Sequence, residues 1–148
     1  MKTIKVNEKE YVLEFSFEAA ERKEVVQDMF NILSGTYIIK NASKGKSAGA
    51  AMFNGVTEMV ADIPRIARES FFAGLLENHN LSSAEAKEVM KSYMKENNLT
   101  YNDLFEEMKI CMEDDGFFDL AGITKMIQTM NQTIENVKPG KDSKKKEN

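Results

Sequence analysis

The sequence has few of the residues that most enzymes use for catalysis. Its 148 residues include one cysteine, one histidine and no tryptophan. A single cysteine, Cys111, excludes an intramolecular disulfide and a cysteine-rich zinc cluster. The one histidine, His79, has neither a nucleophile nor an orienting acid at a recognised spacing. We therefore expect no catalytic residue, no metal site and no cofactor, and expect Cys111 in the core and His79 at an exposed helix end.

Long apolar runs and a basic excess are also missing. No stretch of about 18 apolar residues is present, and Met1-Lys2 is not followed by the apolar core of a signal peptide. The net charge is −4, whereas proteins that mainly bind nucleic acid cluster lysine and arginine. These absences predict a protein of the cytoplasm without a membrane partner, and they disfavour nucleic acid.

The residues that are present have the composition of one globular domain. Hydrophobic residues make up 42% and charged residues 30%, close to globular averages, and a chain of this length can bury a core. The last eleven residues contain five lysines and no large apolar side chain. We expect a single domain over residues 1–137 and a disordered basic tail over 138–148.

The beginning of the chain alternates apolar and polar residues, which is typical of a β-hairpin. Asn7 can adopt the left-handed conformation of a tight turn, although this turn has no glycine. The apolar positions of the alternation are Ile4, Val6, Tyr11, Leu13, Phe15 and Phe17.

Most of the remaining chain has apolar residues spaced three and four apart, as on the buried face of a helix. Pro64 is expected to break or kink the chain between two helices, because proline removes a backbone donor. Residues 36–40 are apolar enough for a third short strand, and residues 41–51 are small and polar, which predicts a loop. The expected helices cover about residues 17–33, 52–63, 64–77, 82–97, 100–114 and 118–137.

Two of these helices begin with capping boxes, Ser82 with Glu85 and Thr100 with Asp103. They predict an αα-hairpin. The expected fold is thus mainly α within the α+β class: an N-terminal β-hairpin packed on a bundle of five to six helices.

Two segments resemble ligand sites but fail on spacing. Gly45-Lys46-Ser47 resembles the end of a phosphate-binding loop, yet the required first glycine falls on Lys40. In the acidic segment 113–116, a calcium loop with Gly116 in sixth place would have to begin at Cys111. We expect a flexible loop at the first segment and a helix end at the second.

The methionines and the last helix provide the candidate binding residues. Ten methionines can fill a core, or they can form an adaptable surface for partners. The last helix has a narrow seam of the kind that packs against another chain, formed by Leu120, Ile123, Ile127, Met130, Ile134 and Val137. A lysine-rich tail can be merely solvated, or it can contact an acidic partner. Our candidate partner-binding residues are Met126, Ile127, Met130, Ile134, Lys144, Lys145 and Lys146.

The order of these features resembles the tail assembly chaperones of long-tailed, siphovirus-type bacteriophages and prophages. The similarity is carried by KVNEKEYVLEF at 5–15, FAGLLENH at 72–79 before Leu81-Ser82, and EDDGFF at 113–118. It covers about residues 1–136. The chain departs from the family at the hairpin turn, where a glycine after the asparagine is usual.

The resemblance implies a chaperone and not an enzyme. Such proteins bind the long helical tape measure protein, keep it soluble until tail tube subunits polymerise around it, and are absent from the finished virion. Many also exist in a longer form made by ribosomal frameshifting, and Lys144–Lys146 could be encoded by such a slippery site. The expected partners in the host bacterial cytoplasm are the tape measure and tail tube proteins of the same phage, with a homo-oligomer left open.

Two other functions remain open at this point. One is a structural component that stays in the particle, such as a tail completion protein. The other is a small helical regulatory or interaction protein.

Overall fold

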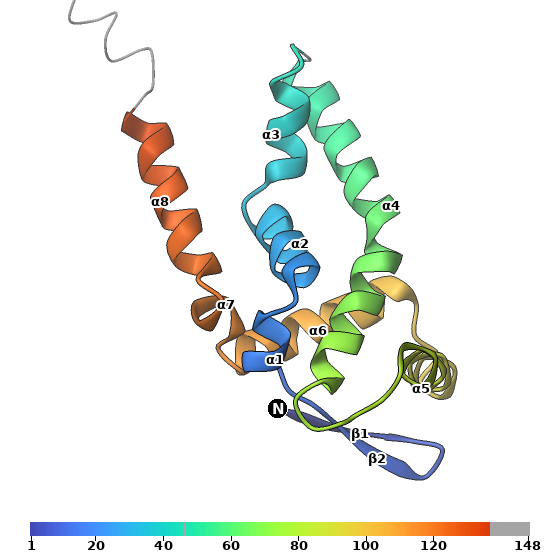
Figure 1. Ribbon diagram of the computed structural model, residues 1–148. Helices are drawn as coiled ribbons and strands as arrows, with labels where there is room; N and C mark the ends of the chain where they lie inside the picture. The colour runs from blue at the N-terminus through green and yellow to red at the C-terminus, as the bar shows by residue number, and fades with distance from the viewer. Residues whose placement is uncertain (46, 137–148) are drawn as a thin grey trace, which may run out of the picture.

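The computed structural model describes residues 1–45 and 47–136 (Figure 1). Within this part the fold is mainly helical with an N-terminal antiparallel hairpin, as the sequence predicts. None of the helices described is long and apolar enough to cross a membrane. The elements are β1 (Lys2–Val6), β2 (Lys9–Leu13), α1 (Phe17–Ala20), α2 (Lys23–Leu33), α3 (Thr36–Ala42), α4 (Ala48–Leu75), α5 (Ser83–Glu96), α6 (Tyr101–Asp114), α7 (Phe117–Leu120) and α8 (Ile123–Asn136).

The hairpin forms through a two-residue turn that needs no glycine. Asn7 and Glu8 both have positive φ, 50° and 67°, the combination of a type I′ turn. Ile4 pairs with Tyr11 in the register of β1 and β2, and both are buried. The expected alternation ends at Phe15, because Phe17 begins α1 and is 70% exposed. The inclusion of Phe17 in the strand was wrong.

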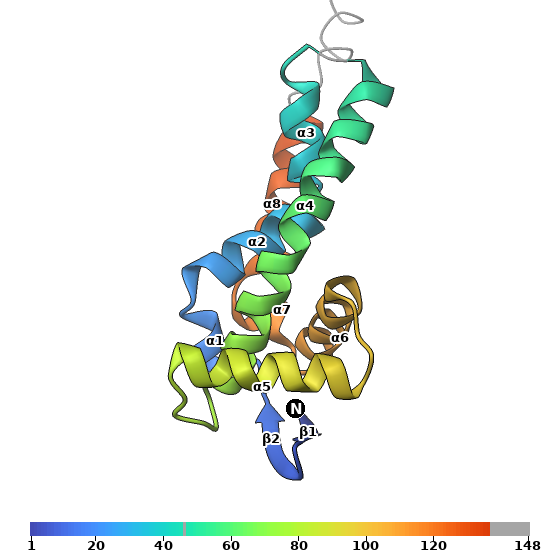
Figure 2. The same ribbon diagram turned by 90° about the vertical axis from the view of Figure 1, so that its right-hand side faces the viewer.

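The main core lies where the hairpin meets the C-terminal part of α4 and the α5–α6 pair (Figure 2). Gly74 allows this approach: a Cβ there would lie 2.9 Å from Cζ of Phe15, and the Glu14 N–H donates to the Gly74 carbonyl at 2.8 Å. The largest fully buried side chains include Leu13, Phe15, Phe71, Met90, Leu104, Met108, Met112 and Phe117.

The two expected capped helices are confirmed as α5 and α6, but they do not lie antiparallel as in an αα-hairpin: α5 is seen end-on in Figure 1, where α6 runs across the view. The Ser82 hydroxyl accepts a hydrogen bond from the Glu85 N–H at 3.1 Å. Thr100 and Asp103 form the complete reciprocal box, with bonds of 2.9 and 3.1 Å. Each cap satisfies backbone donors that a helix N-terminus otherwise leaves unpaired.

Residues 36–40 do not form a third strand, so that expectation was wrong. They belong to helix α3, which packs along the first half of α4. The contact is close because α4 has Gly55 there: a Cβ at this position would lie 2.9 Å from the Tyr37 carbonyl oxygen. The loop expected over 41–51 is correspondingly shorter, since α3 extends to Ala42 and α4 begins at Ala48.

Pro64 does not separate two helices, contrary to the sequence prediction. It lies inside α4, which continues from Ala48 to Leu75. The proline is exposed, so its ring faces solvent while packing of α4 against α3 and α6 holds the helix on both sides. Tertiary packing here outweighs the lost backbone bond.

The helices expected at 17–33 and 118–137 are each divided in two. Glu21 and Arg22 separate α1 from α2, while Ala121 and Gly122 separate α7 from α8. Gly122 has φ of 78°, which suits glycine better than any other residue. The expected basic tail at 138–148 lies outside the residues described.

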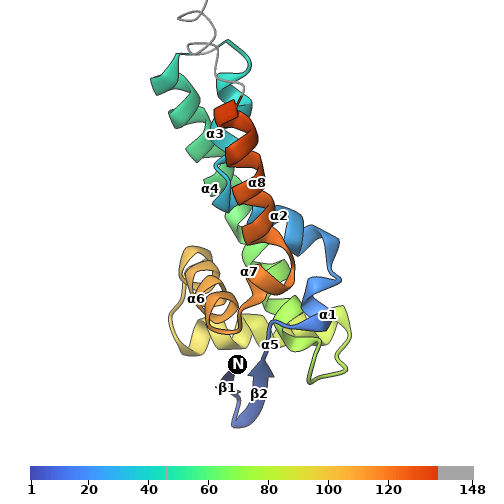
Figure 3. The same cartoon turned by 90° about the vertical axis from the view of Figure 1, so that its left-hand side faces the viewer.

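Three segments extend from the core toward one end of the molecule. They are α3, the first half of α4 and the end of α8, and they lie at the same end in all views (Figures 1, 2 and 3). We call this the distal end.

Candidate functional site

An apolar groove of about 590 Å³ runs between α2 and α8. Its charged residues, Glu21 and Lys23, lie on the α2 side. Its apolar lining comes from Ala20, Val26, Phe30, Ala121, Ile123 and Met126. The groove is the best candidate site because it is concave, mostly apolar and open to a partner.

The α2 wall follows from the amphipathic character of that helix. Val25 and Met29 point into the core and are fully buried. Val26 and Phe30 come one residue later, so they lie about 100° around the helix and are only half-buried. They face α8, which contacts α2 and α7.

Of the partner-binding residues that the sequence singled out on the last helix, only Met126 lines the groove. Ile127 and Met130 are half-buried, whereas Met126 is 58% and Ile134 is 44% exposed. Among the seam residues that the structure describes, only Ile123 is fully buried. The apolar face of α8 is therefore wider than the surface that α2 and α7 cover.

The other residues of the predicted seam and tail are either exposed to solvent or lie outside the described part of the chain. Leu120 leaves the seam because α7 ends there, and it is exposed. Val137 and the lysines Lys144, Lys145 and Lys146 lie outside the residues described. The α2 wall was not predicted, because no signal in the sequence says that α2 and α8 are neighbours.

A second apolar surface lies on the outer side of α4. Ala51 and Gly55 face α3 and are buried, so the stripe on the opposite side of the helix stays uncovered. Its exposed members are Met52, Phe53, Val56 and Val60. Sequence periodicity predicted a buried stripe here, but of its members only Ile63 is fully buried.

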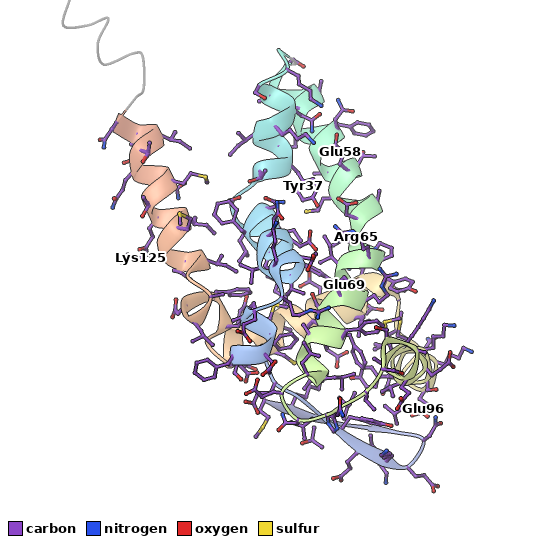
Figure 4. The ribbon with its side chains drawn as sticks, viewed as in Figure 1. Tyr37, Glu58, Arg65, Glu69, Glu96 and Lys125 are labelled. Carbon is purple, nitrogen blue, oxygen red and sulfur yellow. The ribbon has the colours of Figure 1, made fainter. Side chains whose placement is uncertain are left out.

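A polar cluster holds α2 and α3 against α4 (Figure 4). The Arg65 guanidinium donates to both oxygens of Asp28 at 2.9 and 3.1 Å, and Asp28 is only 8% exposed. The Tyr37 hydroxyl donates to Asp62 at 2.8 Å. Burial, with Asp62 next in importance, raises the pKa of Tyr37 to about 12. No pattern in the sequence predicts this cluster, because its members are far apart along the chain.

The polar cluster holds the helices in place and offers little for catalysis. It lines a cavity of about 410 Å³. Among the residues described, no three histidine, cysteine or acidic side chains are arranged to bind a metal ion. Its arginine is occupied by Asp28, and it contains no nucleophile with an adjacent base.

The single histidine is a structural residue. Nε2 of His79 accepts a hydrogen bond from the Val12 N–H at 2.8 Å, and its ring lies 5.3 Å from that of Tyr11. It is half-buried, so the expectation of an exposed helix end was wrong. His79 satisfies the outer edge of β2, where a backbone donor would otherwise face solvent.

Cys111 and the acidic segment behave as the sequence predicts. Cys111 is buried in the core, and burial raises the pKa of its thiol, which keeps it unreactive. The segment 113–116 ends α6, with Gly116 at φ of 70°. The Asp115 carboxylate accepts the Phe15 N–H at 2.8 Å and pairs with the amine of Met1.

Comparison with known proteins finds no protein similar to this chain. No family model, curated protein or solved structure matches the chain.

Proposed function

We propose that this protein is a tail assembly chaperone of a long-tailed bacteriophage or prophage. It binds the tape measure protein in the host bacterial cytoplasm and keeps that protein soluble until tail tube subunits assemble around it. The observation that supports this most directly is the open apolar groove between α2 and α8, with Met126 exposed on its rim.

The groove suits a helical client. A long helix presents an apolar stripe along one side, and a third helix laid between α2 and α8 would cover both half-exposed walls. Along α8 the groove is lined by Ile123 and Met126, which corresponds to about one turn of a client helix. Pliable methionines such as Met126 and Met130 can adapt to clients of different shape.

The strength of such a complex suits temporary binding. Fully burying a side chain such as Met126 or Phe30 contributes about 1.5–3 kcal/mol. A few such side chains exceed the entropic cost of association only modestly. The client can therefore be released when tube subunits compete for it, and the chaperone does not enter the mature virion.

The role requires no catalytic group, and we propose that the protein is not an enzyme. The engagement of His79 with β2 and the burial of Cys111 support a purely binding role. A longer frameshifted form would bring in the tail tube protein. Mass spectrometry of infected cells that finds only the short product would contradict that part of the proposal.

Co-expression with the tape measure protein of the same phage tests the proposal. The intact chain should keep the tape measure protein in the soluble fraction and co-purify with it. Met126→Glu should reduce co-purification at least tenfold, because it places a charge on the apolar wall. Ile110→Glu is the matched control, since Ile110 is 54% exposed on α6, away from the groove.

Two results would overturn the proposal. One is a tape measure protein that fails to bind at low salt, or that binds both variants equally. The other is detection of the chain in purified virions, which would favour a structural tail completion component.

A further inference from the structure

The outer side of α4 has the residue spacing by which two helices pack against each other. Gly49, Phe53, Val56 and Val60 follow one another by four, three and four residues, the spacing of the a and d positions in a coiled coil. All four are exposed, Phe53 by 73% and Val60 by 60%. We call these four residues the α4 stripe.

The α4 stripe points away from the rest of the described chain. Ala51 and Gly55 of the same helix are buried, and Gly55 lies against the backbone of α3. Successive residues of a helix are turned by about 100°, so the stripe lies roughly opposite these two residues. In Figures 1 and 2, no other element of the described chain lies beside this half of α4 on its outer side.

No charged side chain interrupts the α4 stripe. Between Ser47 and Ala61 the sequence has one charged residue, Glu58. It lies on the other side of the helix, where it lines the cavity with Tyr37 and Arg65 (Figure 4). Solvated helix faces usually carry charges, whereas the centre of a protein interface is depleted of them. A membrane-surface helix is rich in lysine and arginine, and this interval contains neither.

We propose that two copies of this protein pair through the α4 stripe, with their α4 helices antiparallel. A two-fold axis between residues 54 and 55 places Phe53 of each copy opposite Val56 of the other, and Gly49 opposite Val60. Each residue of the stripe then has a partner, as a two-fold interface requires of one self-complementary patch.

Side-chain size favours the antiparallel direction over the parallel one. In a parallel pair Phe53 would face Phe53 and Gly49 would face Gly49, which gives one crowded layer and one empty layer. Overpacking and voids both reduce stability. In the antiparallel pair each layer combines a larger side chain with a smaller one.

The shape of the molecule favours the same direction. Figure 1 shows α3 on one side of α4 and α5 on the other, beside the C-terminal end of α4. The stripe faces away from α3, so a parallel pair would bring the two α5 helices against each other. An antiparallel pair places the two cores at opposite ends, and the distal ends overlap between them.

The exposed apolar area is sufficient for a dimer of modest strength. Met52 borders the stripe and is 58% exposed, while Val56 is 42% exposed. Together with Phe53 and Val60, these side chains expose roughly 400 Å² per copy, if a large apolar side chain offers about 150–250 Å². Interfaces are about 60% apolar, so the whole contact would bury about 1,300 Å² over both copies. Stable interfaces begin at about 1,200 Å².

The dimer goes beyond the proposed function and does not depend on it. Helices α2 and α3 lie between α4 and α8 (Figures 1 and 3). The α4 stripe and the groove between α2 and α8 therefore face different sides of the molecule, and each copy can bind a client helix while it is paired.

Sedimentation velocity of the intact chain tests the pairing. The wild type should be dimeric at about 50 μM and dissociate on dilution, as a micromolar dissociation constant requires. Phe53→Glu should weaken the dimer at least hundredfold, because a symmetric interface contains each substitution twice and the two charges repel. Ile110→Glu adds the same charge at an exposed residue of α6 and should leave the dimer intact. Circular dichroism verifies that both variants are folded.

Cysteine variants test the direction and register of the pair. A mixture of Gly49→Cys and Val60→Cys should form a covalent dimer with a short bis-maleimide, because these positions face each other across the axis. Either variant alone should not, since residue 49 of one copy lies about 16 Å along the helix from residue 49 of the other. The wild type, whose Cys111 is buried, supplies the background.

Each result decides the inference. A wild type that stays monomeric at about 100 μM, or equal dimerisation of Phe53→Glu and Ile110→Glu, would overturn it. Cross-linking of Gly49→Cys to itself would overturn the antiparallel arrangement.

Two results would assign the stripe to another partner. A monomeric wild type that loses the tape measure protein on Phe53→Glu would overturn the dimer in favour of a client surface. A monomeric wild type whose flotation with phosphatidylglycerol vesicles depends on Phe53 would overturn it in favour of a lipid surface. Failure of the dimer leaves the proposed function intact, because Met126→Glu tests that function at the groove.

Discussion

Replacing Gly55 with alanine should detach α3 from α4. A Cβ at this position would lie 2.9 Å from the Tyr37 carbonyl oxygen and 3.0 Å from the Ile38 Cα. Both are backbone atoms, so no side chain can rotate to make room and α3 itself must move. Overpacking of this kind costs about 1–3 kcal/mol. Displacing α3 also breaks the bond between Tyr37 and Asp62, worth about 1 kcal/mol.

Gly49 provides the matched control for this substitution. It lies in the same helix, and a Cβ there would meet nothing within 4 Å. Alanine improves helix propensity by up to about 1 kcal/mol at either position, so this gain cancels in the comparison. We expect Gly55→Ala to be less stable than Gly49→Ala by about 2–4 kcal/mol, the sum of the overpacking and hydrogen-bond costs.

Urea unfolding followed by circular dichroism measures this difference. The midpoint should fall for Gly55→Ala and stay level or rise for Gly49→Ala. Limited proteolysis adds a local readout, because a detached α3 exposes the turn between Ala42 and Ala48 to cleavage. Equal stability of the two variants would refute the close packing of α3 on α4.

The remaining predictions concern the polar cluster, a helix cap and the end of the chain. Folding raises the pKa of Tyr37 to about 12. The contribution of Tyr37 to stability is therefore complete below pH 10 and is lost as the pH rises toward 12. Urea midpoints measured from pH 9 upward should fall more for the wild type than for Tyr37→Phe. Thr100→Ala removes one half of the capping box with Asp103 and should cost about 1 kcal/mol in thermal or urea unfolding, whereas no loss would contradict the cap. A chain ended at Asn136 lacks five lysines, and its co-purification with the tape measure protein should depend less on salt than that of the full chain.

Local signals in the sequence were sufficient where neighbouring residues determine the structure. The Ser82 and Thr100 caps each lie within four residues of their partners, so both helix starts were predicted correctly. The hairpin followed from alternation around Asn7, and its two-residue turn needs only the left-handed conformations of Asn7 and Glu8.

Sequence reasoning failed where packing between residues far apart in the chain determines the structure. Tyr37-Ile38-Ile39 is equally suited to a strand, and its helical form depends on Gly55 of α4. The stripe around Met52 and Phe53 has the periodicity of a buried face, but no other element of the described chain covers it. Periodicity indicates that a face is apolar and cannot say whether anything packs on it.

Only one of the two walls of the candidate site could be predicted from the sequence. Met126 and Met130 were identified because the seam of the last helix is narrow, and of these two Met126 lines the groove. The opposite wall, with Val26 and Phe30, required knowledge that α2 and α8 lie side by side, which depends on the chain direction after Gly122.

The proline inside α4 has a consequence for how the molecule opens. Pro64 has no N–H, so the carbonyl of Val60 loses its usual partner one turn later, and Val60 is exposed to water. This missing backbone hydrogen bond divides α4 into a C-terminal segment that packs in the core and an N-terminal segment that belongs to the distal end. Local unfolding that begins at Ala48 can stop at Pro64, because Ile66 and Phe71 hold the following turns in the core. Native-state hydrogen exchange should then show lower amide protection in α4 before Pro64 than after it. The N-terminal segment of α4 could open around an incoming chain while the C-terminal segment stays folded.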